Sequence, residues 1–202
     1  MDSIAGFILV GGESRRMGTA KSGLMLNDQS FVDRIAGEVS GVTHLVAVVG
    51  SNSAALQLKH SSKLTIVSDI YPHWGALGGV HAALATAQLS AEWALIVACD
   101  FPFVTKELFV RLADVREGYD AVAPIQGDSI PQPLCALYRV APCLNRAEDL
   151  IKSGERKPIA LLQSVRTRWI LFNELADLKH ASSLFDNINT PQDYARIARE
   201  RS

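Results

Sequence analysis

The residues best suited to chemistry lie directly after the first apolar run of the chain. Residues 9–21 read Leu-Val-Gly-Gly-Glu-Ser-Arg-Arg-Met-Gly-Thr-Ala-Lys. The paired glycines Gly11 and Gly12 allow backbone N–H groups to approach a ligand closely. The cations Arg16 and Lys21 suit the negative charge of a polyphosphate. This spacing predicts a site for a nucleoside triphosphate near the start of the chain.

Two better-known phosphate-binding motifs do not match this segment. A P-loop needs glycine, lysine and then serine or threonine in succession, whereas Thr19 and Ala20 separate Gly18 from Lys21. The dinucleotide fingerprint G-x-G-x-x-G fails because the glycines at 11 and 12 are adjacent. The remaining alternative is an ordinary surface turn with unrelated cations, and the length of the pattern weighs against it.

A second chemical feature is the carboxylate of Asp100, which follows the apolar run 93–98 and Cys99. Burying a carboxylate is costly unless it is paired or bound to a metal. An oxygen ligand at the end of a strand suits Mg²⁺ that bridges triphosphate oxygens. The alternative is a cap for the next helix, but Thr105 is better placed for that role. We therefore expect Asp100 to bind Mg²⁺.

The surrounding sequence predicts an α/β fold. Apolar runs alternate with segments of helical period, which is typical of a mainly parallel sheet with helices on both faces. Ser30 and Thr105 are expected to cap helices, and Gly154 to end one. Strands are expected at 4–10, 44–50, 64–67, 93–98, 121–124, 134–138 and 168–171, and helices at 30–39, 79–88, 105–116, 141–153 and from 191 to the C-terminus.

The chemically suggestive residues follow successive predicted strands. Gly11 follows the first strand, Asn52 the second, Asp69 the third and Asp100 the fourth. Ligands of open α/β sheets bind at the carboxyl ends of the strands. The sequence therefore places the site at that edge of the sheet, with a glycine-containing loop at 75–79 expected to close over base and ribose.

Composition limits the other classes of function. The chain has 202 residues with 20 basic and 21 acidic side chains, so no global field favours nucleic acid or an anionic membrane. No apolar run approaches the roughly 18 residues of a membrane-spanning helix. The three cysteines form no C-x-x-C pair, which argues against a zinc site or a disulfide framework. We expect one domain over residues 1–202, a cytoplasmic location, and a buried, inert thiol at Cys99.

The segment 9–21 resembles the signature L-A-G-G-x-S-x-R-M-G-x-x-K of small nucleotidyltransferases. The resemblance is greatest to the molybdenum cofactor guanylyltransferases, the molybdopterin-guanine dinucleotide biosynthesis protein A family. Val10 replaces the usual alanine, and Ala20 stands where an acidic residue is frequent. The likeness continues, in the family's order, at Asp69, 75–79, 99–102 and 185–191. It spans nearly the whole chain.

The resemblance implies a three-layer, Rossmann-like nucleotidyltransferase fold and a Mg²⁺-dependent reaction. GMP would pass from GTP to molybdenum-molybdopterin, with pyrophosphate released. The partners implied are GTP, molybdenum-molybdopterin and proteins that mature molybdoenzymes. Such transfers need positioning and charge neutralisation more than covalent catalysis. Lys21 would neutralise the phosphates, Arg16 would bind the β- or γ-phosphate, Asp100 would bind the metal, and Arg15 is expected to point outward.

The resemblance also implies which residues contact the two substrates. Asp69 can accept hydrogen bonds from guanine, although backbone groups of 9–11 could read the base equally well. The expected nucleotide contacts are Leu9, Val10, Gly11, Gly12, Ser14, Lys21, Asn52, Asp69, Gly78 and Asp100. The acceptor side is expected to include Arg156, Lys157, Asn187 and Asn189. Helix-dipole and turn roles are the alternatives for these four, a turn role is the alternative for Asn52, and Asp186 is an acidic alternative as second metal ligand.

Three other functions stay open at this point. A cytidylyltransferase would act on the same cofactor, but its relatives more often carry alanine-glycine where this chain has Gly11 and Gly12. Sugar-phosphate nucleotidyltransferases are usually longer chains. A non-catalytic module that binds nucleotide and delivers cofactor would not need Lys21 and Asp100. The histidines at 60, 73 and 81 lack metal-ligand spacing and are assigned no chemistry.

Overall fold

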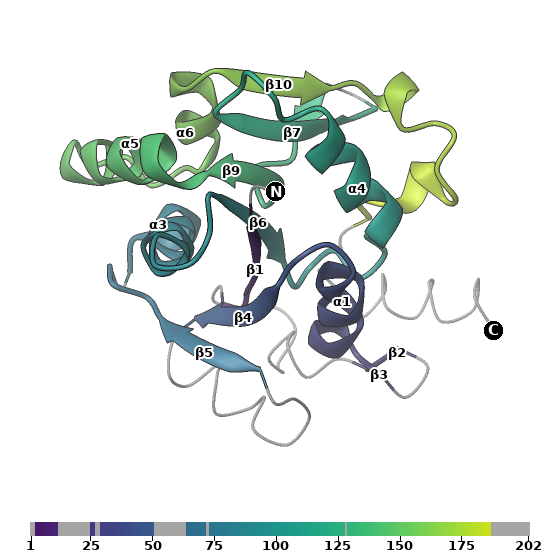
Figure 1. Ribbon diagram of the computed structural model, residues 1–202, viewed down its shortest axis with the longest axis horizontal. Helices are drawn as coiled ribbons and strands as arrows, with labels where there is room; N and C mark the ends of the chain where they lie inside the picture. The colour runs from purple at the N-terminus through teal and green to yellow at the C-terminus, as the bar shows by residue number, and fades with distance from the viewer. Residues whose placement is uncertain are drawn as a thin grey trace.

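The computed structural model describes residues 3–11, 25–26, 29–50, 64–71, 73–127 and 129–186. Figure 1 shows one twisted sheet between two layers of helices. The elements in chain order are β1 (Ile4–Leu9), β2 (Met25–Leu26), β3 (Gln29–Ser30), α1 (Phe31–Ser40), β4 (Leu45–Gly50), β5 (Thr65–Ser68), α3 (Gly75–Ala87), β6 (Trp93–Ala98), α4 (Lys106–Asp114), β7 (Ala121–Gln126), β8 (Ile130–Pro131), β9 (Cys135–Arg139), α5 (Val140–Lys152), α6 (Ile159–Ser164), β10 (Thr167–Ile170), and the 3₁₀ turns η2 (Phe172–Glu174) and η3 (Ala181–Ser183).

The sheet has a parallel core, and within the described residues β9 and the short β8 run in the opposite direction. Its order is β10-β7-β9-β6-β1-β4-β5, and the short β8 pairs with β7. Strands β6, β1, β4 and β5 are parallel neighbours. Strand β9 is antiparallel to both β6 and β7. The mainly parallel sheet is therefore confirmed, and the strand expected at 134–138 is the one that reverses direction.

Each face of the sheet is covered by its own helices. Helices α1 and α4 lie on one face and α3, α5 and α6 on the other (Figure 1). The first core contains Ile35 of α1 and Leu108 of α4. The second contains Leu84 of α3 and Leu144 of α5. Strand β6 is buried along its whole length because both layers cover it, which explains its uninterrupted apolar sequence.

Most helix ends follow the predicted signals. The Ser30 hydroxyl accepts a hydrogen bond from the Asp33 N–H at 3.0 Å, and the Thr105 hydroxyl accepts one from Leu108. Beyond α5, Gly154 has a φ of +92° and donates its N–H to the Ile151 carbonyl. These contacts confirm the two caps and the stop.

The prediction of a loop at 75–79 is wrong. These residues form the first turn of α3, which begins at Gly75 and not at 79. Glycine has a poor intrinsic preference for helix, but Gly78 allows a close approach here. A Cβ on Gly78 would lie 3.0 Å from the Tyr71 carbonyl oxygen and 3.1 Å from the Trp74 Cβ. Close packing against the segment before the helix therefore outweighs propensity in this turn.

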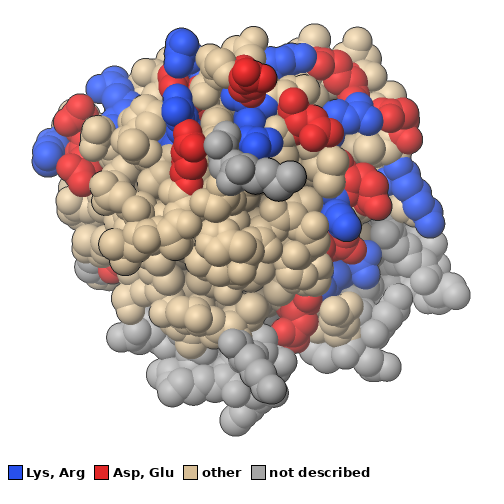
Figure 2. All heavy atoms as spheres, viewed as in Figure 1, with Lys and Arg blue, Asp and Glu red and all other residues tan. Residues whose placement is uncertain are grey.

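The surface carries both signs of charge side by side. Figure 2 shows blue and red side chains interleaved over the upper part of one face, with a largely uncharged area below. Arg139 is 2.8 Å from Glu92, and Arg166 is 3.1 Å from Asp120. The Arg166 bond holds the pKa of the Asp120 carboxyl below its usual value. In the described residues no helix is long and apolar enough to cross a membrane.

Replacing Gly50 with alanine is expected to destabilise the protein. Gly50 ends β4, and a Cβ there would lie 2.2 Å from the carbonyl oxygen of Val10. The strand ends must separate to relieve this clash, which we expect to lower the free energy of unfolding by about 1–3 kcal/mol. Urea denaturation measures the loss.

The control is Gly37→Ala on α1, where an added Cβ meets nothing within 4 Å. Alanine is a better helix former than glycine, so this variant should be at least as stable as the wild-type protein. Equal stability of the Gly50 and Gly37 variants would contradict the close approach of β4 to residue 10.

Candidate functional site

The ends of four parallel strands bring the expected site residues to one edge of the sheet. Leu9 pairs with Ala98 on one side and with Val49 on the other, and Gly50 pairs with Ser68. The chain therefore leaves β1 at Gly11, β5 at Asp69 and β6 at Asp100 along the same edge. Beyond the strands, the Cys99 N–H donates to the Leu9 carbonyl at 3.0 Å. This bond places the start of the glycine loop beside the Asp100 segment.

The backbone after β1 is shaped for a ligand. Gly11 is exposed and has a φ of +141°, a conformation that residues with a Cβ rarely adopt. The side chains of Leu9 and Val10 pack into the cores on opposite faces of the sheet. Leu9 and Val10 can therefore offer a ligand little more than their backbone groups, as the glycine-rich pattern implies.

Asp100 lies partly exposed after the buried strand β6. The Cys99 thiol points to it, with Sγ 3.7 Å from Oδ1, and Cys99 is 4% exposed. Thr105 caps α4 instead, so the alternative capping role of Asp100 is not supported. No cluster of three histidine, cysteine or acidic side chains suited to a metal occurs among the described residues. One carboxylate nevertheless fits Mg²⁺, which takes its remaining ligands from phosphates and water.

A distant segment of the chain lies against the Asp100 loop. The rings of Phe101 and Phe185 meet edge to face, with centroids 6.2 Å apart. Both side chains are buried. This contact joins the start of the motif at 185–191 to the segment that carries Asp100. It gives a physical reason for that motif to begin with phenylalanine.

Asp69 and Gly78 lie together on the other side of the edge. Asp69 Oδ1 accepts the Tyr71 N–H at 2.9 Å, and a Cβ on Gly78 would lie 3.2 Å from the same oxygen. Burial raises the pKa of the Asp69 carboxyl, while the Tyr71 bond, His81 and His73 act in the opposite direction.

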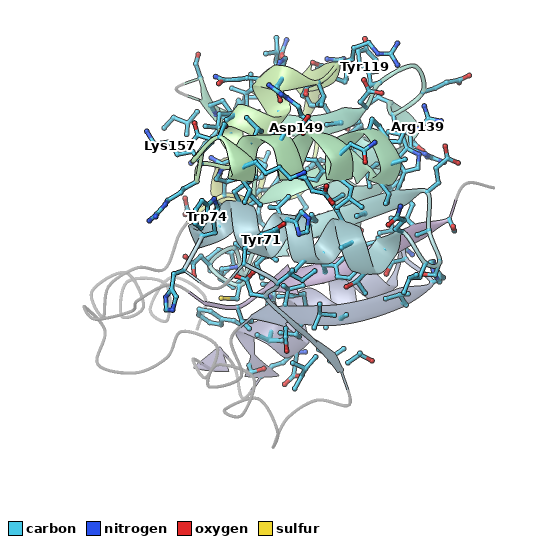
Figure 3. All side chains as sticks on the ribbon, turned by 90° about the vertical axis from the view of Figure 1, so that its left-hand side faces the viewer. Tyr71, Trp74, Tyr119, Arg139, Asp149 and Lys157 are labelled. Carbon is cyan, nitrogen blue, oxygen red and sulfur yellow. The ribbon has the colours of Figure 1, made fainter. Side chains whose placement is uncertain are left out.

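The expected acceptor-side cations approach the start of α3. The Arg156 guanidinium lies over the Trp74 ring, 5.0 Å from its centre. The Trp74 indole N–H donates to the Glu155 carbonyl at 3.0 Å. The Glu155 carboxylate accepts the N–H groups of Arg156 and Lys157. Figure 3 shows Trp74 and Lys157 at the same end of the molecule, away from Tyr119 and Arg139.

The alternative for Arg156 and Lys157 was an interaction with a helix dipole. The basic residue in the last turn of α5 is Lys152, so the dipole of that helix does not account for Arg156. Sequence reasoning missed Trp74. Its position directly before the glycine-rich turn is the signal that could have identified it.

Several expected residues lie outside the part of the chain that the structure describes, and their roles remain predictions. They are Gly12, Ser14, Arg16, Lys21, Asn52, Asn187 and Asn189. The described residues already bring together a glycine turn, a carboxylate suited to Mg²⁺, a second carboxylate beside a helix start, and a pair of cations.

Comparison with known proteins identifies the family. A family model for the MobA-like NTP transferase domain matches residues 6–167. The chain is 34% identical to the probable molybdenum cofactor guanylyltransferase of Pelotomaculum thermopropionicum, covering 98% of this chain and 94% of the relative. It is 31% identical to the molybdenum cofactor guanylyltransferase of Desulfosudis oleivorans, covering 96% and 93%.

Solved structures agree. The crystal structure of molybdopterin-guanine dinucleotide biosynthesis protein A from Archaeoglobus fulgidus is 27% identical with a TM-score of 0.81, over 97% of each chain. The 4-diphosphocytidyl-2C-methyl-D-erythritol synthase of Anaerococcus prevotii, 12% identical over 99% of each chain with a TM-score of 0.71, shares the fold alone. The chain therefore belongs to the MobA-like NTP transferase family of nucleotidyltransferases.

Proposed function

We propose that this protein is a molybdenum cofactor guanylyltransferase, which transfers GMP from GTP to molybdenum-molybdopterin and releases pyrophosphate. Relatives that match nearly the whole chain and are named for this activity support the assignment. The observation that carries it is the placement of Gly11, Asp69 and Asp100 at the ends of neighbouring parallel strands.

The spacing of the strands supports a nucleotide lying along this edge. Strands β5 and β6 are separated by β4 and β1. Three inter-strand intervals correspond to roughly 14 Å, a span suited to an extended nucleoside triphosphate. We place the guanine near Asp69 and the triphosphate near Gly11 and Asp100.

In this arrangement each residue has a separate role in the phosphoryl transfer. The Asp69 carboxylate accepts hydrogen bonds from guanine, and backbone groups at 9–11 hold the nucleotide. Arg16 and Lys21 bind the phosphates, while Asp100 holds Mg²⁺. When bound, the ion neutralises charge on the triphosphate oxygens. The terminal phosphate of the acceptor attacks the α-phosphorus of GTP, and the bond to the β-phosphate oxygen breaks.

The acceptor is assigned to the side of the site near Trp74. There Arg156 and Lys157 offer two cations for the phosphate of molybdenum-molybdopterin, with Asn187 and Asn189 as further contacts. The product would pass to proteins that mature molybdoenzymes. Three buried cysteines, none of them in a disulfide within the described residues, are compatible with a cytoplasmic location. We also propose that residues 1–202 form one domain.

The first test of this function is nucleotide preference. Calorimetric titration compares GTP, CTP, ATP and UTP, each with Mg²⁺. We expect GTP to bind at least tenfold more tightly than the others, which corresponds to about 1.4 kcal/mol. A preference for CTP would assign the protein to the cytidylyl reaction. GTP binding without Mg²⁺-dependent pyrophosphate release in the presence of acceptor would indicate a delivery module.

Removing divalent metal is expected to abolish the transfer. Asp100 then loses the ion through which it acts on the phosphates, and the charges of the reacting groups are no longer neutralised. Pyrophosphate release should fall to background in excess EDTA and return when Mg²⁺ is added. Full activity in EDTA would contradict the role given to Asp100.

A further inference from the structure

His81 is a buried imidazole for which the proposed mechanism has no use. It lies on α3 and is 4% exposed. Neither ring nitrogen has a hydrogen-bond partner within the described structure. The nearest carboxylate oxygen is Glu148 Oε1 on α5, 3.6 Å from Nε2. A buried polar ring without a hydrogen bond is costly, which calls for an explanation.

The ring is linked to the nucleotide edge through Tyr71. The rings of His81 and Tyr71 meet edge to face, with centroids 4.8 Å apart and planes at 77°. The backbone N–H of Tyr71 donates to Asp69 Oδ1 at 2.9 Å. His81 therefore packs against the residue that orients the carboxylate assigned to the base.

We propose that His81 is a positioning residue for Asp69. It fixes Tyr71 by packing and, when protonated, supplies the positive charge that keeps the Asp69 carboxylate ionised for base recognition. This inference rests on the proposed function, because that function makes Asp69 the contact for guanine. It gives a role to a histidine that the sequence pattern left without chemistry.

The charges around the pair favour this role. Burial raises the pKa of the Asp69 carboxyl, and the charge of His81 lowers it. Tyr71 and His73 lie on the same segment as Asp69, and His73 also acts to lower this pKa. From α5, the Glu148 carboxylate faces the ring.

Lys152 offsets the negative charge of Glu148 only in part. Its Nζ lies 3.7 Å from Glu148 Oε2, the oxygen that does not face His81, and its side chain is 68% exposed. Solvent therefore screens its charge.

The ionisation of Asp69 matters for the choice of base. A carboxylate accepts hydrogen bonds through both oxygens, whereas a carboxylic acid presents one O–H donor. Guanine offers two N–H donors on one edge. When Asp69 is protonated, its O–H group faces one of these donors, and one hydrogen bond to the base is lost. GTP affinity should therefore have an acid limb that follows the titration of Asp69, with tight binding above it.

The test is His81→Gln, which keeps a polar side chain and removes the charge. NMR measures the pKa of the Asp69 carboxyl, and calorimetry measures GTP affinity from pH 4.5 to 8. We expect both the carboxyl pKa and the acid limb to rise by about one pH unit. Affinity at pH 8 should stay within about threefold of the wild-type value. Unchanged titration of Asp69 in a folded variant would overturn the inference.

Two further variants keep the test decisive. Glu148→Gln removes the carboxylate that faces His81 and leaves the imidazole in place, so the acid limb should move less than it does in His81→Gln. His180→Gln, a change at an exposed histidine before η3, should leave it unchanged. An equal shift in this control would also overturn the inference. Failure of the wild-type protein to bind GTP at any pH would instead refute the proposed function, and the NMR comparison would still decide the charge effect.

Discussion

Asp100→Asn is expected to leave the protein folded and to reduce GMP transfer by roughly 10²-fold or more. Asparagine has nearly the same shape, and the flanking buried residues Cys99 and Phe101 are unchanged. The substitution removes the negative charge that we assign to Mg²⁺ binding. An amide oxygen is a weaker ligand for a hard cation, so the triphosphate loses charge neutralisation in the transition state.

The measurement is the rate of pyrophosphate release with saturating GTP and acceptor, across a Mg²⁺ series. Higher Mg²⁺ should restore part of the Asp100→Asn activity because the variant binds the ion more weakly. Asp114→Asn is the matched control, since Asp114 is exposed at the end of α4. Its activity should be within twofold of the wild-type value. Full activity of the folded Asp100 variant would remove Asp100 from the mechanism.

Lys21→Ala is the second change with a large expected effect, again roughly 10²-fold in transfer rate. The reason lies in the pattern of 9–21 and in where that pattern begins. Gly11 leaves β1 beside the Asp100 segment, as the Cys99–Leu9 hydrogen bond shows. We assign Lys21 the role of neutralising the negative charge that develops on the phosphates. The loss should therefore appear in kcat as well as in GTP affinity.

Arg15→Ala is the control for Lys21. It removes one positive charge from the same segment at a position expected to point outward. Transfer should fall by less than threefold. Equal losses in the Lys21 and Arg15 variants would mean that the segment acts only through its total charge. Lys21→Arg keeps that charge with a different geometry, so partial activity is expected from it.

Much of the fold follows from the sequence because its signals are local. Strand β6 is an uninterrupted apolar run that ends at a carboxylate, and helices α1 and α4 carry their caps at Ser30 and Thr105. The positions of Gly11, Asp69 and Asp100 at strand ends could be predicted from the order of the strands. The rule that ligands of open α/β sheets bind at the carboxyl ends of the strands then indicated the site.

The features that sequence reasoning missed depend on tertiary contacts. Helix α3 begins earlier than glycine propensity predicts, and Gly78 in its first turn packs closely against Tyr71 and Trp74. The reversal of β9 is set by its insertion between β6 and β7, which periodicity does not encode. The Arg156–Trp74 contact joins residues that are far apart in the chain. No sequence pattern indicated a role for His81, because its burial and its contacts with Tyr71 and Glu148 depend on the tertiary structure.

The most direct test of the central claim follows the phosphorus atoms. The purified protein is incubated with Mg²⁺, molybdenum-molybdopterin and GTP that carries radioactive phosphorus at either the α or the γ position. The account predicts that α-label enters a guanine dinucleotide of the pterin and that γ-label appears in pyrophosphate. Release of γ-label as orthophosphate, or absence of α-label from the pterin product, would contradict it.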